Sequence, residues 1–201
     1  VSYGTSTTRK NVLVHISDGR FTGVGEAAVV PYYGETPERI EHDITALTET
    51  LELNPMLLED MLDALPPMQS SAARAATDMA LHDLWGQQLG RPLYELWGLN
   101  PARSPISSYT VSLPDDDEDY LTRLRAARDY PVIKLKLGSG SWEQDLRYVQ
   151  IARQELDGQI AVDANGGWDA DSALAIIPTL MQIGMLFIEQ PVARDDWEGW
   201  R

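Results

Sequence analysis

Residues 132–137 read VIKLKL, and this alternation of apolar and basic side chains is typical of a β-strand. The segment belongs to a regular series. Strands are expected at 106–112, 132–137, 160–163 and 186–189, and helices at 115–129, 141–156 and 169–183, with another starting near Asp195. Strands that alternate strictly with helices predict a parallel sheet with crossover helices.

Equivalent positions in this series are spaced almost evenly. The steps from Thr110 to Lys136, from Lys136 to Asp163 and from Asp163 to Glu189 are 26, 27 and 26 residues. This period fits a (β/α)8 barrel, although spacing alone leaves a doubly wound sheet open. A whole barrel needs about 200 to 250 residues, so we expect the chain to be an N-terminal fragment of a longer protein.

The first hundred residues follow a different, mixed pattern. Strands at 11–16 and 21–28 predict a hairpin around the turn signal SDGR. Helices are expected from Pro37 to about Leu53 and from Ser70 or Ser71 to Leu89, with a helical turn at 93–97. The stretch 100–105 contains two prolines and is interpreted as a linker.

Composition excludes several classes of protein. The chain has no cysteine, which excludes disulfides, thiolate metal sites and a cysteine nucleophile. Its 31 acidic and 16 basic residues give a net charge of −15, which disfavours nucleic-acid binding. It has no apolar run long enough to cross a bilayer and no apolar signal core at its N-terminus. We therefore expect a soluble, cytoplasmic protein with no nucleic-acid or membrane partner.

Two lysines share one face of the predicted strand at 132–137. Alternation places Lys134 and Lys136 on one side and Ile133, Leu135 and Leu137 on the other. Because the outer face of a barrel strand packs against helices, we expect the lysines to point into the barrel, about 7 Å apart along the strand. Each ammonium is expected to depress the pKa of the other, which suits a lysine that acts as a base.

Carboxylates end the next two predicted strands. Asp163 lies in VDAN and Glu189 in FIEQP, at the strand ends that form the active-site face of a barrel. Two converging carboxylates are suited to Mg²⁺. Taken singly, these residues could be a solvated lysine, a helix cap or an ion pair. Their recurrence at one rim favours a site.

These motifs resemble a known family. KLKLG at 134–138, VDANGGW at 162–168 and FIEQP at 187–191 resemble the enolase superfamily in its muconate-lactonizing branch, and most of all its dipeptide epimerases. Residues 70–98 resemble the end of that family's capping domain, and residues 3–16 with GVGEA at 23–27 resemble its mobile loop and first hairpin. The implied fold is α/β: an α+β capping domain at 1–103, then the first half of a (β/α)8 TIM barrel at 104–201.

The resemblance also implies a reaction. Mg²⁺ would hold a substrate carboxylate and stabilise the enediolate that forms when the α-proton is removed. Lys136 would be the acid/base on one face of the α-carbon, and Lys134 would tune its charge. Asp163 and Glu189 would be metal ligands. A third ligand, expected near position 215, and the opposing base would lie beyond Arg201.

Further residues are weaker candidates. Asn165 is expected to support the metal ligands, or to be a turn residue before Gly166. Tyr3 and Thr5 would contact substrate from the mobile loop, and Glu26 would line the pocket beneath it. An ordinary polar loop and a structural ion pair are the respective alternatives.

Dipeptide epimerisation is the favoured function, with a small-molecule carboxylate as substrate and a homo-oligomer as the full-length assembly. Alternatives in the same branch are muconate cycloisomerase, o-succinylbenzoate synthase and N-acylamino acid racemase. An alternative of another class is a non-catalytic metal- or ligand-binding scaffold, or an inactive fragment.

Overall fold

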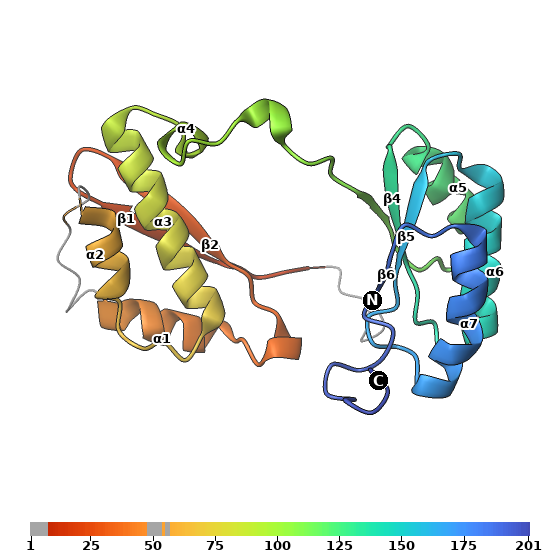
Figure 1. The fold of residues 1–201 in the computed structure, drawn as a ribbon. Coiled ribbons are helices and arrows are strands. Elements are labelled where there is room, and N and C mark those ends of the chain that lie inside the picture. The colour runs from red at the N-terminus through yellow and green to blue at the C-terminus, as the bar shows by residue number, and fades with distance from the viewer. Residues whose placement is uncertain (1–7, 48–53, 55–56) are drawn as a thin grey trace. The chain divides into compact units, whose positions relative to one another are not determined.

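The structure, a computed structural model, describes residues 8–47, 54 and 57–201. The chain separates into two compact units between Ser104 and Pro105. Figure 1 labels the elements of each unit. None of the described helices has the length and apolar character that crossing a bilayer requires.

The first unit begins with the expected hairpin. Strands β1 (Val12–Ser17) and β2 (Thr22–Ala27) pair in antiparallel register, with Val12 opposite Ala27. The elements that follow are η1 (Pro31–Tyr33), α1 (Pro37–Leu47), α2 (Leu58–Asp63), α3 (Ser71–Leu89), α4 (Leu93–Leu96) and η3 (Pro101–Arg103). The sequence did not predict α2, and the expected extension of α1 to Leu53 lies outside the described residues.

Helix α3 packs directly on the hairpin, as Figure 1 shows. Its contact face consists of small residues, because Ala73, Ala76 and Ala80 are fully buried. A Cβ atom on Gly25 of β2 would lie 1.8 Å from the Ala76 carbonyl oxygen. Only glycine at this position therefore allows the backbones to approach so closely.

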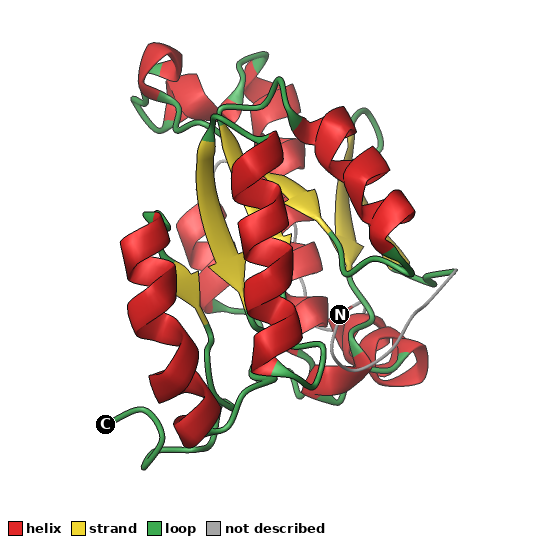
Figure 2. Cartoon of the chain, turned by 90° about the vertical axis from the view of Figure 1, so that its right-hand side faces the viewer, coloured by secondary structure: helices red, strands yellow, loops and turns green. Residues whose placement is uncertain are grey.

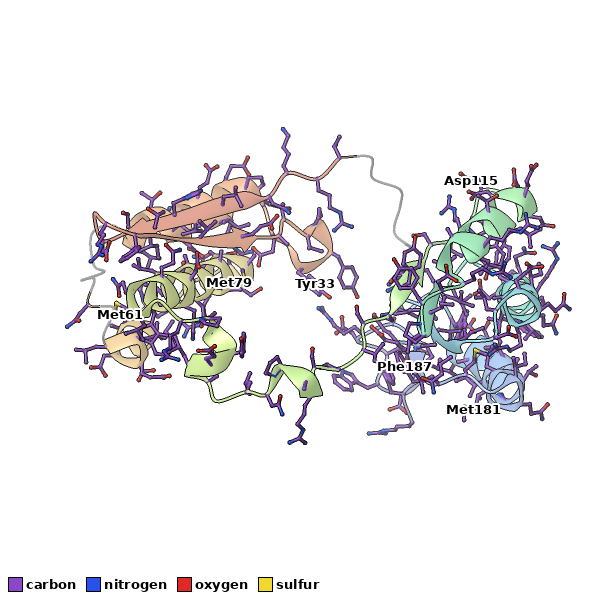
Figure 3. The ribbon with its side chains drawn as sticks, turned by 90° about the horizontal axis from the view of Figure 1, so that it is seen from above. Tyr33, Met61, Met79, Asp115, Met181 and Phe187 are labelled. Atoms are coloured by element: carbon purple, nitrogen blue, oxygen red, sulfur yellow. The ribbon has the colours of Figure 1, made fainter. Side chains whose placement is uncertain are left out.

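Met61 and Met79, both labelled in Figure 3, differ in burial. Met61 of α2 is buried in a second apolar cluster with Leu47 and Leu81, whereas Met79 of α3 is 43% exposed.

Buried polar groups fix the start of α3. Ser70 caps the helix by accepting the Ala73 N–H with its side chain. The buried Glu35 carboxylate accepts the Ser70 hydroxyl at 2.5 Å and the Ala72 N–H at 3.2 Å. Burial raises the pKa of Glu35, but these hydrogen bonds outweigh it and leave the pKa below its ordinary value of 4.5.

The second unit is a four-stranded parallel sheet in the order β3-β4-β5-β6, which confirms the predicted parallel topology. The strands are β3 (Tyr109–Val111), β4 (Val132–Lys136), β5 (Gln159–Asp163) and β6 (Ile188–Glu189). Helices α5 (Asp117–Ala127), α6 (Trp142–Glu155) and α7 (Ala170–Ile183) cover one face, as Figures 1 and 2 show. The helix expected near Asp195 is absent, since residues 194–200 form turns rather than a helix.

The core of this unit lies between the sheet and its helices. Ile133, Leu135 and Leu137 are at most 1% exposed and pack with Leu124 of α5 and Ile176 of α7. The alternation in VIKLKL thus places its apolar residues against the helices, as expected.

We predict that Glu35→Gln makes the first unit less stable and flattens its response to acid. A carboxylate with a depressed folded pKa stabilises the protein above its unfolded pKa, and this contribution is lost as pH falls through the folded value. Removing it should cost about 1–3 kcal/mol near neutral pH and little in acid. Urea denaturation at several pH values measures this. Glu38→Gln, an exposed residue of α1, is the control, and an equal pH slope in both variants would contradict the prediction.

Candidate active site

The register of the parallel strands gathers the predicted charged residues at one edge of the sheet. Lys136 of β4 is directly opposite Asp163 of β5, and Asp163 is directly opposite Glu189 of β6. Residues at opposed positions point to the same face of a sheet. Because Ile133 and Leu135 face the helices, the lysines and carboxylates project from the face without helices.

The four side chains form a connected ionic cluster. The Nζ atom of Lys136 lies 2.6 Å from Oδ2 of Asp163. The Nζ atom of Lys134 lies 2.6 Å from Oε2 of Glu189 and 3.2 Å from Oδ2 of Asp163. Both carboxylates therefore reach one common cation, the Lys134 ammonium.

Burial differs between the two carboxylates. The side chain of Asp163 is 2% exposed and that of Glu189 is 48% exposed. Burial raises the pKa of Asp163, but hydrogen bonds from Lys136, from the Asn165 N–H and from Lys134 outweigh it. The pKa of Asp163 is therefore below its ordinary value, and the carboxylate stays ionised.

The expectation that the lysines would depress each other's pKa is wrong for Lys134. Burial lowers the pKa of Lys134. Hydrogen bonds and charge from Glu189 and Asp163 raise it by more, so the net shift of this pKa is upward. The two carboxylates outweigh the effect of burial because they are within contact distance of the ammonium.

Strained backbone follows two of these strands. Asn165 has φ of 50° and Gln190 has φ of 43°, and they are the two non-glycine residues with positive φ in the described part of the chain. Asn165 directs its N–H to Oδ1 of Asp163 at 2.9 Å. Such conformations persist where the surrounding structure enforces them, and they concentrate at functional sites.

The remaining predicted residues belong to the N-terminal part of the chain. Glu26 lies on β2 in the first unit, where its carboxylate accepts the Asn11 side-chain amide at 2.6 Å. Tyr3 and Thr5 lie outside the described residues.

Sequence reasoning missed Asp145 and Gln190 near the cluster. Asp145 is fully buried and shares the inner face of α6 with Val149 and Ala152. The sequence does contain a signal for Asp145. It is followed by apolar residues at i+4 and i+7, and a residue in that pattern lies on the buried side of a helix. Gln190 has no such signal, since its backbone conformation depends on the loop.

The chemistry of the cluster fits a hard divalent cation. Asp163 and Glu189 offer carboxylate oxygens that converge on one ammonium, and oxygen ligands of this kind suit Mg²⁺. They would be two ligands of a larger set. The described residues hold no group of three His, Cys, Asp or Glu side chains placed to bind a metal.

Comparison with known families places the chain. Residues 1–98 match the family described as "Mandelate racemase / muconate lactonizing enzyme, N-terminal domain", and residues 117–201 match "Enolase C-terminal domain-like". The chain belongs to the mandelate racemase and muconate lactonizing enzyme family. The two matched ranges lie on either side of the division between Ser104 and Pro105.

Relatives in this family carry several enzyme names. The chain is 37% identical to "L-Ala-D/L-Glu epimerase" of Bacteroides thetaiotaomicron, over 94% of this chain and 49% of the relative. It is 30% identical to "Chloromuconate cycloisomerase" of Pseudomonas putida, over 100% of this chain and 57% of the relative. The chain therefore spans about half the length of the curated relatives it matches.

Solved structures of the family share this fold. An enolase family member from Agrobacterium tumefaciens "with homology to dipeptide epimerases", with sodium and L-Ala-L-Glu bound, superimposes with a TM-score of 0.80 at 32% identity. The match covers 97% of this chain and 58% of that one. The muconate lactonizing enzyme of Pseudomonas fluorescens gives a TM-score of 0.85 at 25% identity, covering 99% and 57%. The expected fold, a capping domain followed by part of a TIM barrel, is confirmed.

We predict that Asp163→Asn destabilises the second unit by about 2–4 kcal/mol in metal-free buffer, because two ammonium groups lose their shared buried partner. The double variant Asp163→Asn/Lys136→Met should recover part of that loss. Urea denaturation in the presence of a chelator measures both. Asp171→Asn, at an exposed position of α7, is the control. Equal stability of the control and Asp163→Asn would contradict the prediction.

Proposed function

We propose that the full-length protein is an Mg²⁺-dependent enzyme that removes the proton α to a carboxylate, and that it epimerises dipeptides. The observation that supports this most directly is the cluster at the strand ends. The Lys136 amine lies beside Asp163, and Asp163 and Glu189 both reach the Lys134 ammonium. This combination of base and metal ligands is the one that proton abstraction next to a carboxylate needs.

Each member of the cluster has a role in this proposal. Asp163 and Glu189 would hold Mg²⁺, which when bound would offset the negative charge that develops on the substrate carboxylate. Lys136, with its amine in the neutral form, would take the α-proton at Nζ, and its contact with Asp163 fixes the position of that nitrogen. Lys134 neutralises the carboxylates. The Asn165 N–H holds the Asp163 carboxylate from the loop side.

The choice of dipeptides rests on the relatives. The name of the Bacteroides thetaiotaomicron relative specifies L-Ala-D/L-Glu, and relatives from Maribacter and Flavobacterium johnsoniae are named L-Ala-D/L-amino acid epimerases. We also propose that Tyr3, Thr5 and Glu26 contact the substrate, and that the enzyme is a cytoplasmic homo-oligomer. Epimerisation further requires a second base on the opposite face of the α-carbon.

Muconate cycloisomerisation is the second candidate, because relatives at 29–31% identity are named muconate or chloromuconate cycloisomerases and the fold of a muconate lactonizing enzyme fits equally well. The two reactions share the cluster and differ in substrate. Both are therefore assayed on the same protein.

The test is deuterium incorporation from D2O into the α-position of a dipeptide library by the full-length protein with Mg²⁺, followed by mass spectrometry. We expect incorporation into a subset of dipeptides that carry L-Ala first, and no turnover of cis,cis-muconate. Muconate turnover without incorporation would favour the second candidate. Failure of both would overturn the proposal.

We predict that Lys136→Ala lowers this incorporation by about 10²–10⁴-fold, because it removes the general base. The affinity for Mg²⁺, measured by calorimetry, should not weaken, since both carboxylate ligands remain. Arg128→Ala, at an exposed position after α5, is the control. Equal incorporation by Lys136→Ala and the parent would refute the role of Lys136.

A further inference from the structure

Asp145 is a fully buried carboxylate that the proposed chemistry does not use. It lies in the first turn of α6 and is 0% exposed. Its Oδ2 accepts the Gly138 N–H at 2.9 Å and the Trp168 indole N–H at 2.7 Å, and its Oδ1 accepts the Ser139 N–H at 3.1 Å. No cation pairs with it among the residues that the structure describes.

These donors come from the loops that follow two strands of the cluster. Gly138 and Ser139 come directly after Leu137, two and three residues beyond Lys136. Trp168 is 4% exposed and lies in the loop that follows Asp163. The Asp145 carboxylate therefore binds two loops, the one that follows Lys136 and the one that follows Asp163.

Trp168 extends the connection to the third strand. Its backbone N–H donates to the Pro191 carbonyl at 3.2 Å, and it forms an isolated parallel bridge with Val192. These two residues follow Glu189. The hydrogen bonds thus run from Asp145 through all three loops that carry the cluster.

The two loops that Asp145 joins are also in direct backbone contact. A Cβ atom on Gly138 would lie 2.4 Å from the Ala164 carbonyl oxygen, and one on Gly167 would lie 2.7 Å from Cα of Gly138. Such close contact leaves little room for either loop to shift alone. A change in the anchor on one loop is therefore transmitted to the other.

We propose that Asp145 is a positioning residue of the active site, which locks the loops after β4, β5 and β6 into one unit and thereby sets the distance between Lys136 and Asp163. The catalytic part of this inference rests on the proposed function. A displacement of about 1 Å in a reacting group can cost 10²-fold in rate, so a residue that never touches substrate can control the reaction.

Two variants test the connection in the full-length protein. Asp145→Asn replaces the carboxylate, which accepts hydrogen bonds from N–H groups, by an amide whose NH2 group donates them. Trp168→Phe removes only the indole donor and keeps an aromatic ring in the core, so it tests the same link if Asp145→Asn fails to fold. Glu143→Gln is the matched control, because it makes the same kind of change in the same turn of α6 without contacting the loops after β5 and β6.

The first measurement is amide hydrogen exchange, which does not depend on activity. We expect Asp145→Asn to exchange faster than the control in residues 137–140, 164–168 and 190–192. Trp168→Phe should exchange faster mainly in the last two segments. Faster exchange confined to α6 and residues 137–140 would overturn the connection between the loops.

The second measurement separates positioning from a loss of folded enzyme. The two epimers of a dipeptide present their α-protons on opposite faces, so only one of them faces Lys136. We expect Asp145→Asn to change the ratio of the two deuterium-incorporation rates by about tenfold or more. Partial unfolding would lower both rates equally, and an unchanged ratio would overturn the positioning role. If the parent protein incorporates no deuterium into any dipeptide, the proposed function fails. Amide hydrogen exchange then decides by itself whether Asp145 connects the loops.

Discussion

The Asp163 carboxylate is the group on which the second unit depends. It is almost completely buried, and it accepts the Lys136 ammonium and the Asn165 N–H while lying 3.2 Å from the Lys134 ammonium. A buried charge is tolerated only when it is paired and hydrogen-bonded. Three features meet this requirement at the Asp163 oxygens. The strand register and the lysine pattern bring the two ammonium groups, and the turn after β5 brings the Asn165 N–H.

Three buried carboxylates show how different partners produce different roles. Glu35 accepts hydroxyl and amide groups at the start of α3, and Asp145 accepts two backbone amides and an indole. Both are surrounded by neutral donors. Asp163 instead faces two ammonium groups and an acidic neighbour strand. Of these three carboxylates, only Asp163 is paired with ammonium groups and lies next to a second carboxylate, which is why the proposed chemistry is placed there.

Close backbone packing recurs in both units and serves the same purpose. In the first unit Gly25 lets the hairpin approach α3, and in the second Gly138 lets the loop after β4 approach the loop after β5. A site built on parallel strands needs its loops held to within fractions of an ångström. Direct backbone contact provides this at a low cost in conformational entropy, because short loops in contact have few alternative arrangements.

Local patterns in the sequence determined most of the helices, the hairpin, the parallel order of the strands and the residues at the strand ends, since a period of 2 or 3.6 residues and a constant βα spacing are properties of the chain itself. The pKa of Lys134, the positive φ of Gln190 and the contacts of Asp145 were decided only in the folded protein. Each of these depends on groups that are distant in sequence and meet across strands or loops. Electrostatic and hydrogen-bonding effects follow distance in space, which a local pattern does not contain.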